Sequence, residues 1–154
     1  MADIRGFLKV ERAEHDERPA AQRINDSKEF VIEPSNDELK AQASRCMDCG
    51  IPFCHNGCPL GNVIPEFNDA VYRGRVDDAA RILASTNNFP EITGRVCPAP
   101  CEASCVLNIE NTPVAIKDVE RTIANHVFSQ PLEPQPSPFR TGKPAEDKYL
   151  KVVA

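Results

Sequence analysis

Seven cysteines, all lying between Cys46 and Cys105, are the residues of this sequence best suited to chemistry. A first run has the spacing C-x2-C-x4-C-x3-C-P and consists of Cys46, Cys49, Cys54 and Cys58. A second run has the spacing C-x3-C-x3-C and consists of Cys97, Cys101 and Cys105. Thiolates repeated at such short spacings are typical ligands of zinc ions and of iron–sulfur clusters.

The spacing of the cysteines distinguishes between zinc, haem and iron–sulfur sites. Structural zinc takes four Cys or His ligands, and the seven cysteines with His55 would make two such sites. A c-type haem needs C-x-x-C-H, but Gly50 follows Cys49, which excludes it. A bacterial ferredoxin run is C-x2-C-x2-C-x3-C-P, which the first run matches with two extra residues. We therefore favour iron–sulfur clusters over zinc and over ordinary buried cysteines.

A cubane cluster needs four ligands that point inward, three from a tight loop and the fourth from a distant segment. Glycines in the loop let the backbone wrap closely, with its N–H groups directed at sulfides. Seven cysteines do not complete two four-ligand sites, so another residue type must supply the last ligand. The nearby candidates are His55, Glu102, Glu110, Asp118, Glu120 and His126. His55 is also a candidate hydrogen-bond partner of a sulfide.

Helical periodicity predicts the elements that must position these ligands. Ser35 or Asn36 caps a helix that should continue to Gly50. Three further helices are expected at 62–74, at about 77–86, and from Pro113 through 127. No strand-like alternation occurs, which predicts an all-α fold.

Composition predicts the organisation and the environment of the chain. Its 154 residues carry a net charge of −5 without a dense cluster of bases, so we expect no nucleic-acid partner. No apolar run reaches a membrane span and no signal peptide is recognisable, so we expect a cytoplasmic protein without a membrane partner.

Residues 1–34 are expected to form an arm over a partner or over the core, or else a partly disordered leader. Residues 130–154, rich in proline, are expected to form a linker or tail.

The sequence resembles the N-terminal iron–sulfur domain of the glutamate synthase small subunit and, more distantly, that of dihydropyrimidine dehydrogenase. The matching stretches are Gly6-Phe7-Leu8-Lys9, the run from Cys46 through Pro59-Leu60-Gly61-Asn62, the segment 91–102, and Pro113-Val114-Ala115-Ile116-Lys117. The resemblance implies an alpha-helical ferredoxin fold at 35–129, around two [4Fe–4S] clusters.

The resemblance also implies how the ligands are divided. One cluster would take Cys46, Cys49, Cys54 and Cys105, and the other Cys58, Cys97, Cys101 and a side chain from the following helix. In the dehydrogenase that side chain is a glutamine seven residues after a proline. In this sequence Glu120 lies seven residues after Pro113. We therefore expect Glu120 to be the eighth ligand, with a solvated helix-face acid as the alternative.

The function that the resemblance implies is electron relay. Electrons from NADPH would pass through FAD on a reductase module and these clusters to the glutamate synthase large subunit, which forms glutamate from glutamine and 2-oxoglutarate. No G-x-G-x-x-G motif follows the tail, so we expect this chain to lack the FAD and NADPH site and not to be a complete enzyme. The alternatives are a zinc-stabilised interaction module and a non-catalytic docking fragment.

Five arginines lie near the cysteine runs or on the expected helices, namely Arg45, Arg73, Arg75, Arg81 and Arg95. They could form a docking face for an acidic partner or offset the charge of a cluster. The interpretation we favour is that they belong to solvated helix faces. His15 and His126 are likewise expected at the surface or in helix packing.

Overall fold

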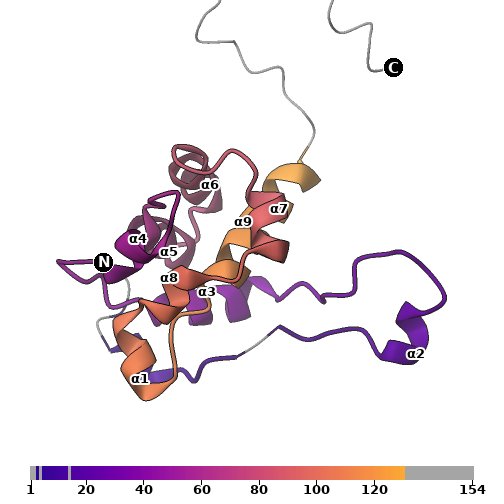
Figure 1. Ribbon diagram of the computed structural model, residues 1–154, viewed down its shortest axis with the longest axis horizontal. Helices are drawn as coiled ribbons and strands as arrows, with labels where there is room; N and C mark the ends of the chain where they lie inside the picture. Colours follow the sequence, from indigo (N-terminus) through magenta and orange to yellow (C-terminus); the bar gives the residue numbers. More distant parts are fainter. Residues whose placement is uncertain (1–2, 4, 14, 131–154) are drawn as a thin grey trace, which may run out of the picture.

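The computed structural model describes residues 3, 5–13 and 15–130, and these are predominantly helical (Figure 1). The elements in chain order are α1 (Gly6–Lys9), α2 (Ala20–Arg23), α3 (Asn36–Ser44), α4 (Phe53–Gly57), α5 (Ile64–Tyr72), α6 (Val76–Ala84), α7 (Pro90–Val96), α8 (Pro100–Ala103), the 3-10 helix η1 (Val106–Glu110) and α9 (Ile116–Ser129). The described residues contain no strand beyond one isolated bridge, between Glu17 and Val31. The predicted all-α class is therefore confirmed.

A single small core holds these helices together. Helix α9 packs against α7, α6 and α3, while α5 packs against α3 and α6. The apolar side chains between them include Leu39, Ile64, Phe67, Val71, Leu83, Ile116, Val119 and Ile123. Because burial of such side chains is the main favourable contribution to folding, this core fixes the longer helices to which the cysteine-bearing segments attach.

The start of α3 follows directly from the sequence. The Ser35 hydroxyl accepts a hydrogen bond from the Glu38 backbone N–H at 3.3 Å. The Glu38 carboxylate in turn accepts one from the Ser35 backbone N–H at 2.8 Å, which completes a capping box. The predicted end of this helix at Gly50 was wrong, because α3 stops at Ser44. Asp48 adopts a left-handed conformation with φ of 51°, which a continuing helix does not permit.

Two predicted helix starts also differ from the structure. Helix α5 begins at Ile64 rather than at residue 62, with Pro65 in its first turn. Helix α9 begins at Ile116 rather than at Pro113, because its first turn is fixed by a distant side chain. The Glu102 carboxylate accepts a hydrogen bond from the Lys117 backbone N–H at 2.9 Å, as a local capping residue would.

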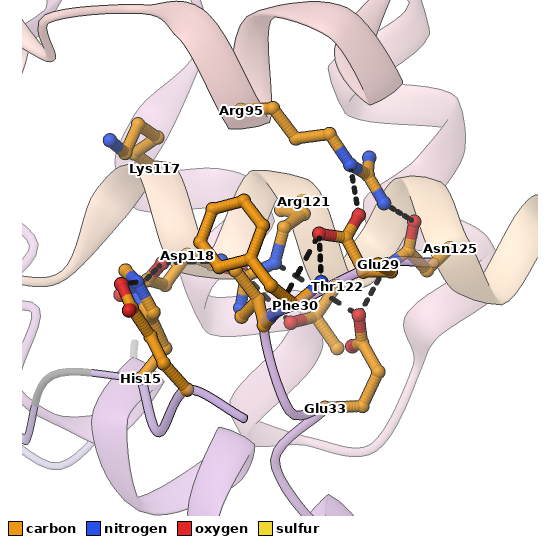
Figure 2. A network of polar contacts seen from close by, with 12 residues as sticks. His15, Glu29, Phe30, Glu33, Arg95, Lys117, Asp118, Arg121, Thr122 and Asn125 are labelled. Carbon is orange, nitrogen blue, oxygen red and sulfur yellow. Dashed lines mark hydrogen bonds and ion pairs between the residues drawn. The ribbon is translucent and has the colours of Figure 1, made fainter. Parts of the chain in front are cut away.

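The segment before α3 forms an arm that lies on this chain's own core. Its outer part is a hairpin, in which the Arg18 N–H donates to the Phe30 carbonyl at 2.7 Å, and α2 lies at its tip, away from the body (Figure 1). Figure 2 shows the docking of the arm, where Arg95 of α7 binds Glu29 at 2.5 Å and Asn125 of α9 at 3.1 Å. Of the predicted tail at 130–154, Gln130 caps the end of α9, and residues 131–154 lie outside the described residues.

No helix in the described part of the chain is both long enough and apolar enough to cross a membrane.

Candidate metal centre

The structure gathers the predicted site residues into two sets at two cavities. A small cavity is lined by the first set, which consists of Cys46, Cys49, Cys54 and Cys105. A second cavity of about 190 Å³ is lined by the second set, which consists of Cys58, Cys97, Cys101 and Glu120. Each set draws on both cysteine runs, and all seven cysteines are free thiols.

Helix α8 is the element that lets both runs serve both sets. It carries Cys101 toward the second cavity, and Cys105, two residues after its end, lies at the first cavity. It packs against α4, which carries Cys54 and is followed by Cys58. Because α4 and α8 each end between the two cavities, one helix contact brings together four of the seven cysteines.

The thiols of the first set lie in an apolar environment. Burial raises the pKa of Cys46 to about 12, and burial with the nearby Cys105 raises that of Cys54 to about 11. Burial also raises the pKa of Cys49. These groups are therefore protonated at neutral pH when nothing binds them, and a metal must displace their protons on binding.

Both cysteine loops direct a backbone N–H group at the first sulfur of the run. In the first loop the donor is the N–H of Asp48, which points at Cys46. In the second loop the N–H of Ala99 donates to the Cys97 sulfur at 3.4 Å. Both donors have a positive φ, of 51° and 53°, which costs about 1–2 kcal/mol for a residue with a side chain. Such strain recurs at ligand-binding loops, and N–H groups near thiolate sulfur tune the potential of a bound cluster.

Glu120 is the only member of the second set that is not a cysteine. Its side chain is just 6% exposed, and the Asn62 amide donates to its Oε1 atom at 3.0 Å. Burial raises its pKa. Burial first, and then the charge of Glu120, raises the pKa of Cys101. The alternative of a solvated helix-face acid is therefore wrong, because this carboxyl group faces the cysteines of the second cavity.

Asn62 is a site residue that the sequence analysis assigned only to a helix start. It is buried, and its carbonyl oxygen accepts a hydrogen bond from the Thr86 hydroxyl at 2.9 Å. This bond leaves the Asn62 amide nitrogen oriented toward Glu120. Thr86, which follows α6, thereby helps to fix the orientation of the Glu120 carboxylate on α9. The signal available in the sequence was its position, four residues after Cys58 in one of the stretches that carried the resemblance.

The remaining histidine candidates are engaged elsewhere. The Nε2 atom of His55 accepts a hydrogen bond from the Ile64 backbone N–H at 2.9 Å, at the start of α5. His126 lies beside Asp77 at 3.0 Å, on an exposed part of α9. Among the described residues, no group of three His, Cys, Asp or Glu side chains converges closely enough to hold a single metal ion.

Comparison with known proteins identifies the family of the chain. The family described as dihydropyrimidine dehydrogenase domain II, 4Fe-4S cluster, matches residues 23–131, which is more than half of the chain. The chain belongs to this 4Fe-4S domain family. The match includes both cysteine runs. The residues at both cavities fit such a group because they combine buried and half-buried thiols, N–H groups directed at sulfur and one buried carboxyl group.

Relatives of this 4Fe-4S domain include subunits of glutamate synthases. The chain is 53% identical over 145 residues to the glutamate synthase [NADPH] small chain of Mycobacterium tuberculosis (strain ATCC 25618 / H37Rv), which covers 93% of this chain and 30% of the relative. It is 47% identical over 153 residues to that of Bacillus subtilis (strain 168), covering 93% and 31%. It is 47% identical over 141 residues to the glutamate synthase [NADH] of Saccharomyces cerevisiae, covering 90% and 7%. The chain thus spans less than a third of the length of these relatives.

The arginines of the 4Fe-4S domain separate into two kinds. Arg73, Arg75 and Arg81 are exposed and lie beside Asp69 and Asp78, as expected for solvated helix faces. Arg45 departs from that expectation, because it is only 2% exposed.

Proposed function

We propose that this chain is an electron-transfer domain that holds two [4Fe–4S] clusters. Its membership of the 4Fe-4S family supports the type of cluster. The observation that supports two clusters is the division of the seven cysteines and Glu120 into two sets of four at two cavities. Four inward ligands for each cubane match the ligand count of a [4Fe–4S] cluster.

The proposed ligands of the first cluster are Cys46, Cys49, Cys54 and Cys105, and those of the second are Cys58, Cys97, Cys101 and Glu120. A bound cluster supplies one-electron transfer, whereas the protein supplies ligation, position and environment. Apolar neighbours such as Ile64 and Val114 line the first cavity and keep water away from it. The N–H groups of Asp48 and Ala99 lie where they stabilise negative charge on sulfur.

The role that we propose for the domain is relay within a glutamate synthase. The names of its relatives include NADPH and glutamate synthase. The family resemblance implies the rest of the path, in which NADPH would deliver electrons through FAD on a reductase module and the glutamate synthase large subunit would receive them. In this proposal the FAD and NADPH sites lie on the module and not on residues 1–154, so the chain alone is not a complete enzyme. The cytoplasm is the proposed location, since its reducing conditions keep thiols free.

Iron and sulfide analysis tests the two-cluster proposal. Protein purified without oxygen is expected to be brown and to contain about eight iron and eight acid-labile sulfide ions per chain. Paramagnetic resonance of the reduced protein should then show two interacting centres. A colourless sample that contains zinc and no labile sulfide would overturn the proposal in favour of a zinc-stabilised module.

Replacement of Glu120 tests the ligand that is not a cysteine. Glu120→Ala should lose or alter the signal of one centre and leave the other unchanged, because only the second set contains this residue. Glu110→Ala is the matched control, since Glu110 is an exposed acid that lies outside both sets. If the Glu120→Ala protein keeps both signals and all of its iron, this carboxylate is not a ligand.

A further inference from the structure

Arg45 is a buried cation whose neighbour in the chain, Cys46, belongs to the first cysteine set. It directly precedes Cys46 and forms the C-terminal cap of α3, with only 2% of its surface exposed. Its guanidinium donates hydrogen bonds to two backbone carbonyl groups, those of Val10 in the arm and of Thr112 at 2.6 Å. The third nitrogen, Nε, is buried without a hydrogen-bond partner.

The other buried arginines have carboxylate partners. Arg121, equally buried, lies 2.9 Å from Asp118 and 4.0 Å from Glu33 (Figure 2). Arg12, which is partly buried, pairs with Glu102 at 2.9 Å. Within residues 3, 5–13 and 15–130, no carboxylate forms an ion pair with Arg45.

A buried charge without a counter-charge is unfavourable, so something must compensate it. Carbonyl groups and the C-terminal end of α3 offer partial negative charge, but no net charge. Cys46 of the first set is the neighbour of Arg45 in the chain, and one of the two acceptors of Arg45, Thr112, lies two residues before Val114, which lines the cavity of that set. Burial and the like charge of Arg12 lower the pKa of Arg45, and Cys105 of the first set acts in the opposite direction. The natural counter-ion of this guanidinium therefore lies in the first cysteine set.

We propose that Arg45 is the built-in counter-ion of the cluster held by the first set, and that it raises the reduction potential of that cluster. This inference rests on the proposed function. Four thiolates outweigh the positive charge of a [4Fe–4S] core, so the ligated cluster is anionic, and reduction adds one more negative charge. A fixed positive charge nearby stabilises the reduced state more than the oxidised state, because the attraction grows with the charge of the cluster.

Two substitutions separate charge from packing. Arg45→Gln removes the charge, and Arg45→Lys keeps it while losing the planar fork that joins the two carbonyl groups. A redox titration of the anaerobic full chain, monitored by paramagnetic resonance, is expected to show one centre shifted to lower potential in Arg45→Gln. At a fixed potential the ratio of reduced to oxidised cluster should fall about tenfold, which equals ~59 mV for a one-electron couple. The Arg45→Lys protein should stay near the wild-type value.

Arg81→Gln is the control, because it removes an arginine that is 77% exposed and should shift neither centre. Equal potentials in wild type and Arg45→Gln would overturn the inference, as would equal shifts in Arg45→Gln and Arg45→Lys. If Arg45→Gln fails to assemble the first cluster while Arg45→Lys assembles it at the wild-type potential, the charge is required and the inference stands. If both fail, Arg45 acts only by joining the arm to the loop. Absence of clusters from the wild-type chain would instead refute the proposed function itself.

Discussion

Gly57 is a point of close contact between the two cysteine runs. A Cβ atom at this position would lie 2.2 Å from the Ser104 hydroxyl, 2.6 Å from the Ser104 Cβ and 3.0 Å from the Pro100 carbonyl oxygen. The hydroxyl has little freedom to move away, because it donates to that same carbonyl group. We expect Gly57→Ala to push α4 away from α8, to cost about 1–3 kcal/mol of stability as overpacking does, and to lower the iron content.

Gly50→Ala is the matched control for this prediction. A Cβ atom at Gly50 would meet no atom within 4 Å, although the residue lies in the same cysteine-rich loop. Iron content and thermal unfolding of both variants can be compared with those of the wild type. If Gly57→Ala binds as much iron as Gly50→Ala and melts at the same temperature, then the contact between α4 and α8 does not need to be this close.

Glu120 shows how far single residues can be inferred from sequence. The spacing of the cysteines demanded one more ligand but left six side chains open, and only the resemblance selected Glu120. The structure distinguishes it physically, because it is a buried carboxyl group aligned by Asn62 beside three cysteines. Neither the burial of Glu120 nor that of Arg45 is visible in a sequence, since both depend on segments that are distant along the chain.

The arm is an element whose attachment depends on ionised carboxylates. The Arg95 guanidinium, as the main cause, lowers the pKa of Glu29 below its ordinary value of 4.5. A lowered carboxylate pKa contributes stability that is present above the ordinary value and is lost as the pH falls through the folded one. The arm should therefore loosen on acidification, while its internal Arg18–Asp26 pair persists, because the pKa of Asp26 is lowered to about 2.

Glu29→Gln should reproduce this loosening at neutral pH. Limited digestion with trypsin is the measurement, because Arg23, which is followed by Ile24, is a cleavage site in the hairpin of the arm. We expect faster cleavage there than in the wild type, by a modest factor, since the ion pair is partly exposed and such pairs contribute little. Asp37→Asn, at an exposed position of α3, is the control. Equal cleavage rates in all three proteins would show that other contacts hold the arm.

The elements that the sequence predicted are those with enough turns to show a period. Helices α3, α5, α6 and α9 have 9, 9, 9 and 14 residues, and each was anticipated with shifted ends. Helices α4 and α8 have only five and four residues, which is too short for an amphipathic pattern and too short to be stable alone. They exist because tertiary contacts hold them, such as the one at Gly57.

The whole molecule has a small apolar core for its length. Phe67 is the largest fully buried apolar side chain in the described part of the chain, and the sequence contains no Trp. Several large side chains are exposed instead, among them Ile51, Phe53 and Val96, which are next to or near the cysteines. A core of this size contributes limited stability, so ligation of the clusters should supply much of the free energy of folding.

Removal of the clusters should therefore unfold most of 46–128. Without metal, the short helices that carry the cysteines lose the centres that join them. Circular dichroism and thermal melting of the chain, before and after anaerobic treatment with an iron chelator, measure the effect. We expect loss of most helical signal and of a cooperative transition. Cys97→Ser, which removes a proposed ligand from the second set only, should give a smaller loss. If the metal-free chain instead keeps full helicity and melts cooperatively, the apolar core between α3, α5, α6 and α9 is sufficient, and the clusters serve electron transfer without being needed for the fold.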